Sequence, residues 1–288
     1  MALVGVLVST HQKSTSEAPS SKQSANTPSV NDAPRGRETN NLPSQSNAPA
    51  SSDPTNAPIS KPSSNLYYGI PVQDYVLGKF DPKTIEQFIT ASFFPVKASN
   101  PLLRKDTADA LDKLFLAFNT DYPNLNVSYL SATRSFRTQK GIWDYKWDND
   151  PRYKDLPDSQ KPLGILEYSS MPGTSRHHWG TDMDIYSLEP EDFVDGPGAI
   201  FYQWMLGNAA RFGFCNPFNA GRSQGYREER WHWSYMPVSS ILIKDWLSLY
   251  SSGRFGTSVD FKGSSSVSDL AEVYVKNINP SCLNWINK

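Results

Sequence analysis

Three of the four histidines lie in two short segments that also carry carboxylates. Residues 175–184 read SRHHWGTDMD, and residues 228–233 read EERWHW. Imidazole and carboxylate groups are ligands that zinc takes in proteins, and a catalytic zinc site uses three of them and keeps one position open. His177, Asp184 and His232 therefore form a candidate site for one zinc ion per chain.

A candidate base lies beside the second histidine segment. A carboxylate that does not bind the metal can take a proton from an activated water, and Glu229 is placed for this role three residues before His232. Strand neighbours three apart face opposite ways, so both can serve one site only if a turn enters the strand at Trp231. Glu228 is the competing carboxylate, and the spacing to His232 favours Glu229.

The first segment predicts a turn followed by a short strand at 181–186. On such a strand Asp182 and Asp184 share one face, and Met183 and Ile185 point to the other face, toward the core. Gly180 would allow the sharp turn that brings His177 back over Asp184.

Two other interpretations fit the same residues. A histidine in an aromatic region is more often a packed core residue than a ligand, and spacing alone does not separate these two roles. A Ser/His/Asp hydrolase with Ser175 as nucleophile is also formally possible. The sequence around Ser175 lacks the Gly-x-Ser-x-Gly turn that exposes such a serine, which argues against it.

The segments that must position these residues predict an α+β fold, because short strands and helices alternate without a regular βαβ rhythm. Residue patterns predict a helix N-terminus at Asp81, helices at 103–118, 134–147, 197–212 and 239–250, strands at 127–132, 181–186 and 231–235, and a loop at 148–162.

Composition divides the chain into three parts. Residues 1–9 contain a short apolar run that is a candidate remnant of a secretion signal and is too short to span a bilayer. Residues 10–65 are rich in Ser, Pro and Asn and contain no aromatic residue, which predicts a disordered linker, either a spacer or a dispensable leader. Residues 66–288 hold every aromatic side chain and predict the folded domain, and no segment reads as transmembrane.

Charge and cysteine content narrow the class further. The net charge is -1 and no run of Lys or Arg occurs, so a nucleic-acid partner is not expected. The two cysteines, Cys215 and Cys282, are either buried free thiols or one disulfide that pins the C-terminal tail. The stretch 259–288 matches nothing catalytic, and we expect it to pack on the domain.

Three motifs, taken in order, resemble the VanY-type D-alanyl-D-alanine carboxypeptidases, a group of zinc peptidases related to lysostaphin-like and hedgehog-like folds. The sequence SATRSFRTQ at 131–139 resembles the family's Ser-Gly-Tyr-Arg-Ser-x-x-x-Gln segment. The family's Ser-x-His-x-x-Gly-x-x-x-Asp matches 175–184, and its Glu-x-Trp-His matches 229–232. The resemblance covers roughly residues 67 to 240 and implies a small antiparallel sheet that carries the zinc site between flanking helices.

The resemblance also assigns roles to residues. It implies that zinc is bound by the candidate triad and that Glu229 is the base. It places Arg134 on the scissile carbonyl or the developing oxyanion, a role suited to a permanent planar donor. The other implied substrate contacts are Gln139 and Ser175, which would hold the terminal D-alanine carboxylate, and Ser131 and Trp231.

The chain departs from the family pattern at several positions. Asp182 stands where a small residue is usual, and it is either a hydrogen-bond partner of a ligand histidine or a solvent-facing carboxylate. Thr133 replaces the family's tyrosine. His178 is expected to be structural or to lie at the rim, because neighbouring strand residues point apart. The stretch 168–173 forms either a wall of the site or a simple turn.

Together these features predict a zinc-dependent D-alanyl-D-alanine carboxypeptidase that removes the terminal D-Ala from peptidoglycan stem peptides. A peptidoglycan endopeptidase or an L,D-carboxypeptidase could use the same site. A non-catalytic wall-binding module is the alternative from another class. We expect a monomer in the bacterial cell envelope, either periplasmic or membrane-anchored.

Overall fold

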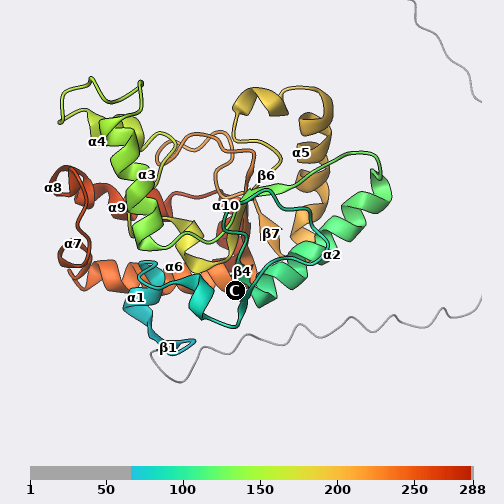
Figure 1. Cartoon of the computed structure of the whole chain (residues 1–288), viewed down its shortest axis with the longest axis horizontal. Helices are drawn as coiled ribbons and strands as arrows, with labels where there is room; N and C mark the ends of the chain where they lie inside the picture. Colours follow the sequence, from blue (N-terminus) through green and yellow to red (C-terminus); the bar gives the residue numbers. More distant parts are fainter. Residues whose placement is uncertain (1–65, 287–288) are drawn as a thin grey trace, which may run out of the picture. The chain divides into compact units, whose positions relative to one another are not determined.

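The computed structural model describes residues 66–286 (Figure 1). The signal remnant expected at 1–9 and the linker expected at 10–65 lie outside the described residues. Among residues 66–286, no helix is both long enough and apolar enough to cross a membrane.

A four-stranded antiparallel sheet occupies the centre of the domain, with strand order β5–β6–β8–β7. In the register, Asp184 of β6 lies opposite His232 of β8, and Asp182 lies opposite Ser234. The predicted strands are confirmed with shorter bounds, and β7 was missed because two residues carry no alternating pattern. The strands are β5 Tyr129–Ser131, β6 Asp182–Ile185, β7 Phe214–Cys215 and β8 His232–Tyr235.

Four long helices surround the sheet where the sequence predicted them. They are α2 Lys105–Asp121, α3 Phe136–Asp148, α5 Gly196–Asn208 and α6 Met236–Ser251. The last turn predicted for α5 is the separate 3-10 helix η4 Ala209–Phe212. The Ser135 side chain caps α3 by accepting a hydrogen bond from the Thr138 backbone N–H, which sets the start of that helix.

Short elements fill the remaining chain and were mostly not predicted, because a single turn shows no periodicity. The short helices are α1 Val72–Val76, α4 Lys161–Ile165, α7 Phe255–Ser258, α8 Ser264–Val267, α9 Ala271–Lys276 and α10 Pro280–Ile286. The other 3-10 helices are η1 Pro82–Thr84, η2 Arg176–Trp179, η3 Pro190–Phe193 and η5 Ser268–Leu270, and the two outer hairpins pair β1 Leu66–Tyr67 with β2 Ile70–Pro71 and β3 Phe88–Ile89 with β4 Leu103–Arg104.

Three local predictions need correction. The helix expected from 103 begins at Lys105, because residues 103 and 104 pair with β3 instead. Asp81 does cap a helix by accepting from the Lys83 N–H, but that helix ends after three residues because Ile85 is extended. The loop expected at 148–162 ends where α4 begins.

Two apolar clusters lie on opposite sides of the central sheet. Met183 and Ile185 belong to the cluster formed with α2 and α5, as the strand alternation predicted, and Trp233 joins them there. The second cluster joins α3, α6 and the short C-terminal helices. In Figure 1, α2 and α5 lie to the right of the strands, and α3, α4 and α7–α9 lie to the left. The polar face of β6 and β8 is therefore turned toward the second cluster.

The C-terminal segment is joined to the sheet both covalently and by packing. Cys215 of β7 and Cys282 of α10 form a disulfide, so the alternative of two free thiols is wrong. Val259, Phe261 and Val275 are buried in the cluster around α6. The expectation that this segment packs on the domain is confirmed.

Candidate metal centre

The three predicted ligands come together from three elements. His177 lies in η2, Asp184 in β6 and His232 in β8, and one potential ligand atom from each lies within 4.8 Å of the others. Asp184 Oδ1 is 3.3 Å from His177 Nε2 and 3.2 Å from His232 Nδ1. All three side chains are buried, so their polar atoms face one another rather than water.

A left-handed turn at Gly180 brings His177 over the sheet. The residue has φ +73° and ends η2 directly before β6 begins. A Cβ at this position would lie 2.6 Å from Phe88 Cε1, so only glycine fits both the conformation and the space. The turn predicted from the sequence is confirmed.

Each ligand histidine is held through its second ring nitrogen. His177 Nδ1 donates to the Ala132 carbonyl over 2.8 Å, and His232 Nε2 donates to Asp182 Oδ1 over 2.9 Å. These bonds orient the two rings and direct the remaining nitrogens toward Asp184. Metal-binding histidines are typically held in this way.

Two buried atoms at the centre have no hydrogen-bond partner among the described residues. They are His177 Nε2 and Asp184 Oδ1. Buried polar atoms nearly always have a hydrogen-bond partner, so two such atoms without one indicate that a further binding partner belongs at this centre. Two imidazoles and one carboxylate form a donor set that zinc accepts, and the residues present therefore fit a zinc ion.

Asp182 is a hydrogen-bond partner of a ligand histidine and does not face solvent. Its carboxylate is fully buried and also accepts from Arg176 Nε over 2.9 Å and from the hydroxyls of Thr181 and Ser234. Burial alone would raise the pKa of Asp182, but the charge of Arg176 and the bond with His232 hold it well below its usual range. The carboxylate is therefore a permanent anion behind the ligand His232.

The acidic surroundings also change the protonation of His232. Burial alone would lower the pKa of His232, but its hydrogen bond with Asp182 and its close approach to the Asp184 carboxylate outweigh this and raise the pKa to about 9. In contrast, burial and the charge of Arg134 lower the pKa of His177. At neutral pH His232 is therefore an imidazolium in the metal-free protein. A metal ion must displace the proton on its Nδ1.

Glu229 lies at the edge of this centre. Its Oε2 is 3.5 Å from His232 Nδ1, and the side chain is buried. The backbone N–H of His232 donates to the Glu229 carbonyl, which forms the predicted turn before β8. Burial raises the pKa of Glu229 to about 7, an effect that His232 opposes and Asp184 reinforces.

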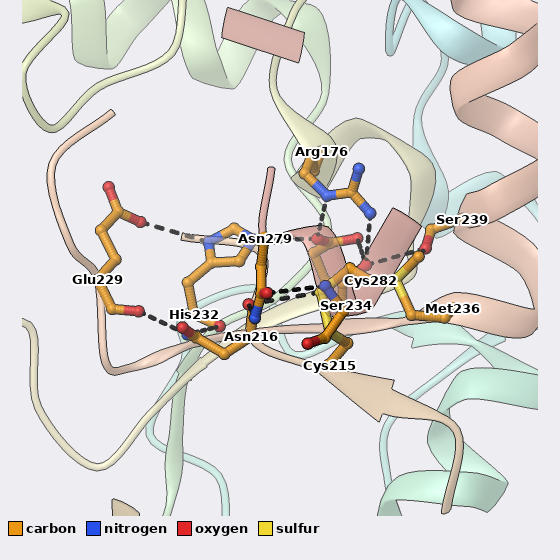
Figure 2. Close-up of a disulfide and its surroundings, with 12 residues drawn as sticks. Arg176, Cys215, Asn216, Glu229, His232, Ser234, Met236, Ser239, Asn279 and Cys282 are labelled. Atoms are coloured by element: carbon orange, nitrogen blue, oxygen red, sulfur yellow. Dashed lines mark hydrogen bonds and ion pairs between the residues drawn. A yellow bond between two sulfur atoms is a disulfide. The ribbon is translucent and has the colours of Figure 1, made fainter. Parts of the chain in front are cut away.

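The same turn is held by a residue that sequence reasoning missed. The Asn216 amide Nδ2 donates to the carbonyls of Glu229, over 2.8 Å, and of His232, over 2.7 Å (Figure 2). Asn216 directly follows Cys215 of the disulfide, and its own carbonyl accepts from Asn279. The C-terminal segment therefore contacts the backbone that carries the candidate base and a ligand. No sequence signal pointed to a single asparagine 13 residues before Glu229.

Arg134 binds the carboxylate oxygen of Asp184 that lies away from the histidines. Its Nη2 is 3.0 Å from Asp184 Oδ2, its Nη1 donates to Gln139 Oε1, and its Nε donates to Ser131 Oγ. The side chain is 21% exposed. The guanidinium is thus fixed on one side and open to the cleft on the other.

Two predicted substrate-binding residues lie below the cleft surface. Gln139 is fully buried, and both ends of its amide are used, by Arg134 and by the Ser170 carbonyl. Ser175 is 1% exposed, and its hydroxyl has no partner among the described residues. Their contact with a substrate stays a prediction, and Gln139 acts in this structure on the position of Arg134.

A cleft of about 640 Å³ opens over the centre. Asp184, Glu229 and Arg134 form its floor, and the predicted residues Ser131 and Trp231 also line it. Its outer parts carry charges of both signs and several polar side chains: Asn100, Lys146, Arg152, Tyr168, Ser169, Glu189 and Glu191.

The remaining departures from the family pattern have structural roles. His178 is fully buried on the 3-10 turn η2, where its Nδ1 donates to the Arg134 carbonyl and its Nε2 accepts from the Gly173 N–H. The structural interpretation is confirmed, although on a turn and not a strand, and the rim alternative is wrong. The Thr133 hydroxyl donates to the Leu102 carbonyl. In the stretch 168–173, the first two residues line the cleft and the glycine turns with φ +90°.

Residues 100–238 match the family model described as VanY, D-alanyl-D-alanine carboxypeptidase. This range contains all three motifs and every residue placed at the centre. The predicted resemblance to the VanY family is therefore confirmed over residues 100–238.

One curated protein of Haemophilus influenzae, described as uncharacterized, is 32% identical over 80 residues. The match covers 23% of this chain and 61% of that protein, so the chain spans less than two thirds of this relative.

Several solved structures are similar to the chain at low sequence identity. The LdcB LD-carboxypeptidase is 19% identical with a TM-score of 0.43, and the match covers 70% of this chain and 81% of that chain. A variant of the vancomycin-resistance D,D-pentapeptidase VanY in complex with Zn(II) is 24% identical with a TM-score of 0.41, covering 58% and 89%. DacB from Streptococcus pneumoniae D39 is 23% identical with a TM-score of 0.36, covering 61% and 83%. These likenesses concern the fold alone.

Proposed function

We propose that the chain is a zinc-dependent D-alanyl-D-alanine carboxypeptidase that removes the terminal D-Ala from peptidoglycan stem peptides. The observation that carries this proposal is the pair of unsatisfied buried atoms, His177 Nε2 and Asp184 Oδ1, facing His232 Nδ1. The match of residues 100–238 to the VanY family model supports the substrate class.

His177, Asp184 and His232 would hold the ion. A bound zinc ion supplies Lewis-acid activation of water and of the peptide carbonyl. Asp182 keeps the His232 ring in the orientation that binding requires, and Arg134 does the same for Asp184 through its second oxygen.

Glu229 is the proton carrier in this proposal. Its pKa of about 7 suits a group that must take a proton from water and then give it to the leaving amine near neutral pH. Its carboxylate lies close to His232 and at the floor of the cleft, so a peptide bond bound there is within reach.

Arg134 would stabilise the negative charge that develops on the carbonyl oxygen. A guanidinium fixed by three hydrogen bonds needs little reorganisation during the reaction, and such preorganised donors are the most effective in catalysis. Ser131 and Trp231 line the same cleft and would contact the peptide on either side of this position.

The same centre could also serve an L,D-carboxypeptidase or a peptidoglycan endopeptidase, and a non-catalytic wall-binding module could retain it. Action on peptidoglycan would place the protein in the bacterial envelope, either periplasmic or membrane-anchored, and we expect it to act as a monomer. The position of the bond that is cut distinguishes the three enzymes, and the absence of turnover identifies the binding module.

The test is turnover of muropeptides by the purified full chain, with metal content measured on the same sample. Release of one D-Ala from peptides that end in D-Ala-D-Ala, abolished by a chelator and restored by zinc, is the expected result. Release of D-Ala only from peptides that end in L-residue-D-Ala, or cleavage only inside cross-links, would replace the substrate assignment. Bound zinc without any turnover would contradict the enzyme assignment.

A further inference from the structure

The cleft carries a second cationic group that the proposed reaction does not use. Lys146 lies on α3, is half-buried, and lines the same cleft as Arg134 and Glu229. The sequence motifs gave it no role.

Lys146 lacks the partner that a half-buried ammonium usually has. Its Nζ donates to Ser169 Oγ over 2.5 Å, and no carboxylate of residues 66–286 forms an ion pair with it. The two neighbouring basic groups differ in this respect, because Lys140 on the same helix pairs with Asp144 and Arg152 pairs with Asp150. The charges of Asp150 and Glu229 act on Lys146 only from beyond ion-pair distance, and an anion entering the cleft would supply the direct counter-charge that this half-buried ammonium lacks.

The environment of Lys146 agrees with a site that waits for an anion. Burial lowers the pKa of Lys146, and the charge of Arg152 lowers it further. The negative charge of a bound carboxylate would raise this pKa and so oppose both effects.

Ser169 completes a pair of donors. Its oxygen accepts from Lys146, while its own O–H is committed to no acceptor among the described residues. Ser169 is itself 7% exposed, so its position is fixed by its surroundings. An ammonium and a hydroxyl side by side suit the two oxygens of one carboxylate.

The position along α3 indicates which carboxylate is bound. Gln139 holds Arg134 at the centre, and Lys146 follows seven residues later, so their Cα atoms lie about 10 Å apart along the helix. One extended peptide residue spans only about 3.5 Å. A carboxypeptidase leaves one residue beyond the cut bond, so this spacing suits a carboxylate in the part of the peptide that precedes the bond better than the terminal carboxylate.

We propose that Lys146 and Ser169 form a subsite for a carboxylate of the substrate that lies two or three residues before the cut bond. This inference rests on the proposed function and narrows its substrate class to peptides with an internal acidic group. Lys146 is thus a specificity-determining residue, and the terminal carboxylate is bound elsewhere.

The experiment compares three peptides that end in D-Ala-D-Ala: one with a free internal carboxylate, one with that group as a carboxamide, and one with the terminal carboxylate as a carboxamide. Binding to the zinc-loaded full chain carrying Glu229→Gln is measured by calorimetry, and KM and kcat are measured on the parent chain. The parent is expected to prefer the internal acid over its amide by about tenfold to a hundredfold, mainly in KM, as for a hydrogen-bonded charge.

Lys146→Met should remove this preference and leave zinc content unchanged. Lys146→Arg should keep most of it, and the control Lys140→Met should keep all of it, because Lys140 does not line the cleft. The subsite would be overturned if Lys146→Met bound all three peptides more weakly by the same factor. It would also be overturned if the variant still preferred the internal acid over its amide and lost only the preference for a free terminal carboxylate. If Lys146→Met does not fold, Lys146→Arg provides the test, and loss of the preference for the internal acid in that variant would overturn the subsite.

The two proposals fail in different ways. Absence of hydrolysis by the parent chain contradicts the proposed function, whatever Lys146 binds. Normal hydrolysis with no preference for the internal acid contradicts only the subsite.

Discussion

The two halves of the cleft are built differently. At the metal end, His177, Asp184 and His232 are buried, and each is held by at least one further residue. At the outer end, Lys146 is half-buried and held by a single hydroxyl. The metal end is preorganised for one chemistry, whereas the outer end can exchange its contacts with the bound peptide. Changes at the metal end should therefore affect turnover and metal binding, and changes at the outer end should affect substrate preference.

The largest effect is expected at the base. Glu229→Gln should lower kcat by about a hundredfold to ten-thousandfold, because the variant can no longer carry the proton, while zinc content stays at the parent level. Glu228→Gln is the matched control, since Glu228 pairs with Arg230 at the surface and should leave kcat unchanged. Equal losses in both variants, measured by single-turnover kinetics, would remove the distinction between the two carboxylates.

Zinc binding should weaken as the pH falls. The pKa of His232 is raised to about 9 in the metal-free protein, so below pH 9 a proton competes for the nitrogen that the metal needs. One competing proton weakens apparent affinity about tenfold per pH unit, so a change from pH 8 to pH 6 should weaken it about a hundredfold. Competition with a chromophoric chelator measures this, and an affinity that does not change with pH would contradict the assignment of His232.

Removal of the anion behind His232 tests whether the metal end depends on its supporting contacts. Asp182→Asn should weaken zinc binding by about tenfold to a hundredfold, as is usual for residues that orient a ligand. It should also lower the pKa of His232, because the carboxylate that stabilises the imidazolium is gone. The pH profile of zinc binding would then shift toward lower pH. An unchanged profile would show that Asp182 does not act through His232.

The smallest effect is expected at Asn216. Asn216→Leu removes hydrogen bonds to two backbone carbonyls, of which the Glu229 carbonyl keeps its bond from the His232 N–H, and this should lower the free energy of unfolding by about 1–3 kcal/mol and slow turnover several-fold. Asn279→Leu is the comparison, because it removes the bond to the Asn216 carbonyl and the bond from the Ser281 N–H but keeps both bonds donated by Asn216, so it should affect turnover less. Thermal unfolding of the zinc-loaded chain, with kcat measured in parallel, checks both variants.

The two halves also differ in how far the sequence predicted them. The metal end could be predicted because its residues fall in motifs of fixed spacing, and because alternation along β6 places Asp182 and Asp184 on one face. The turn at Gly180 followed from its need for a left-handed conformation. The α+β fold followed from the lengths and order of the periodic segments.

The supporting contacts could not be predicted, because they join residues that are distant in sequence. Asn216, directly after β7, meets Glu229 in the turn before β8, and Lys146 meets Ser169, which follows it after a loop and the helix α4. Gln139 shows the limit of a motif, since the pattern suggested a substrate contact while the fold buries its side chain under Arg134.

The central claim is that a zinc ion binds to one particular set of atoms. Anomalous diffraction at the zinc edge, on crystals of the full chain, locates the ion directly. The account predicts one zinc ion coordinated by His177 Nε2, Asp184 Oδ1 and His232 Nδ1, with a fourth position open toward Glu229. An ion bound elsewhere would contradict it, as would an ion bound to His232 Nε2, the nitrogen that donates to Asp182 in this structure.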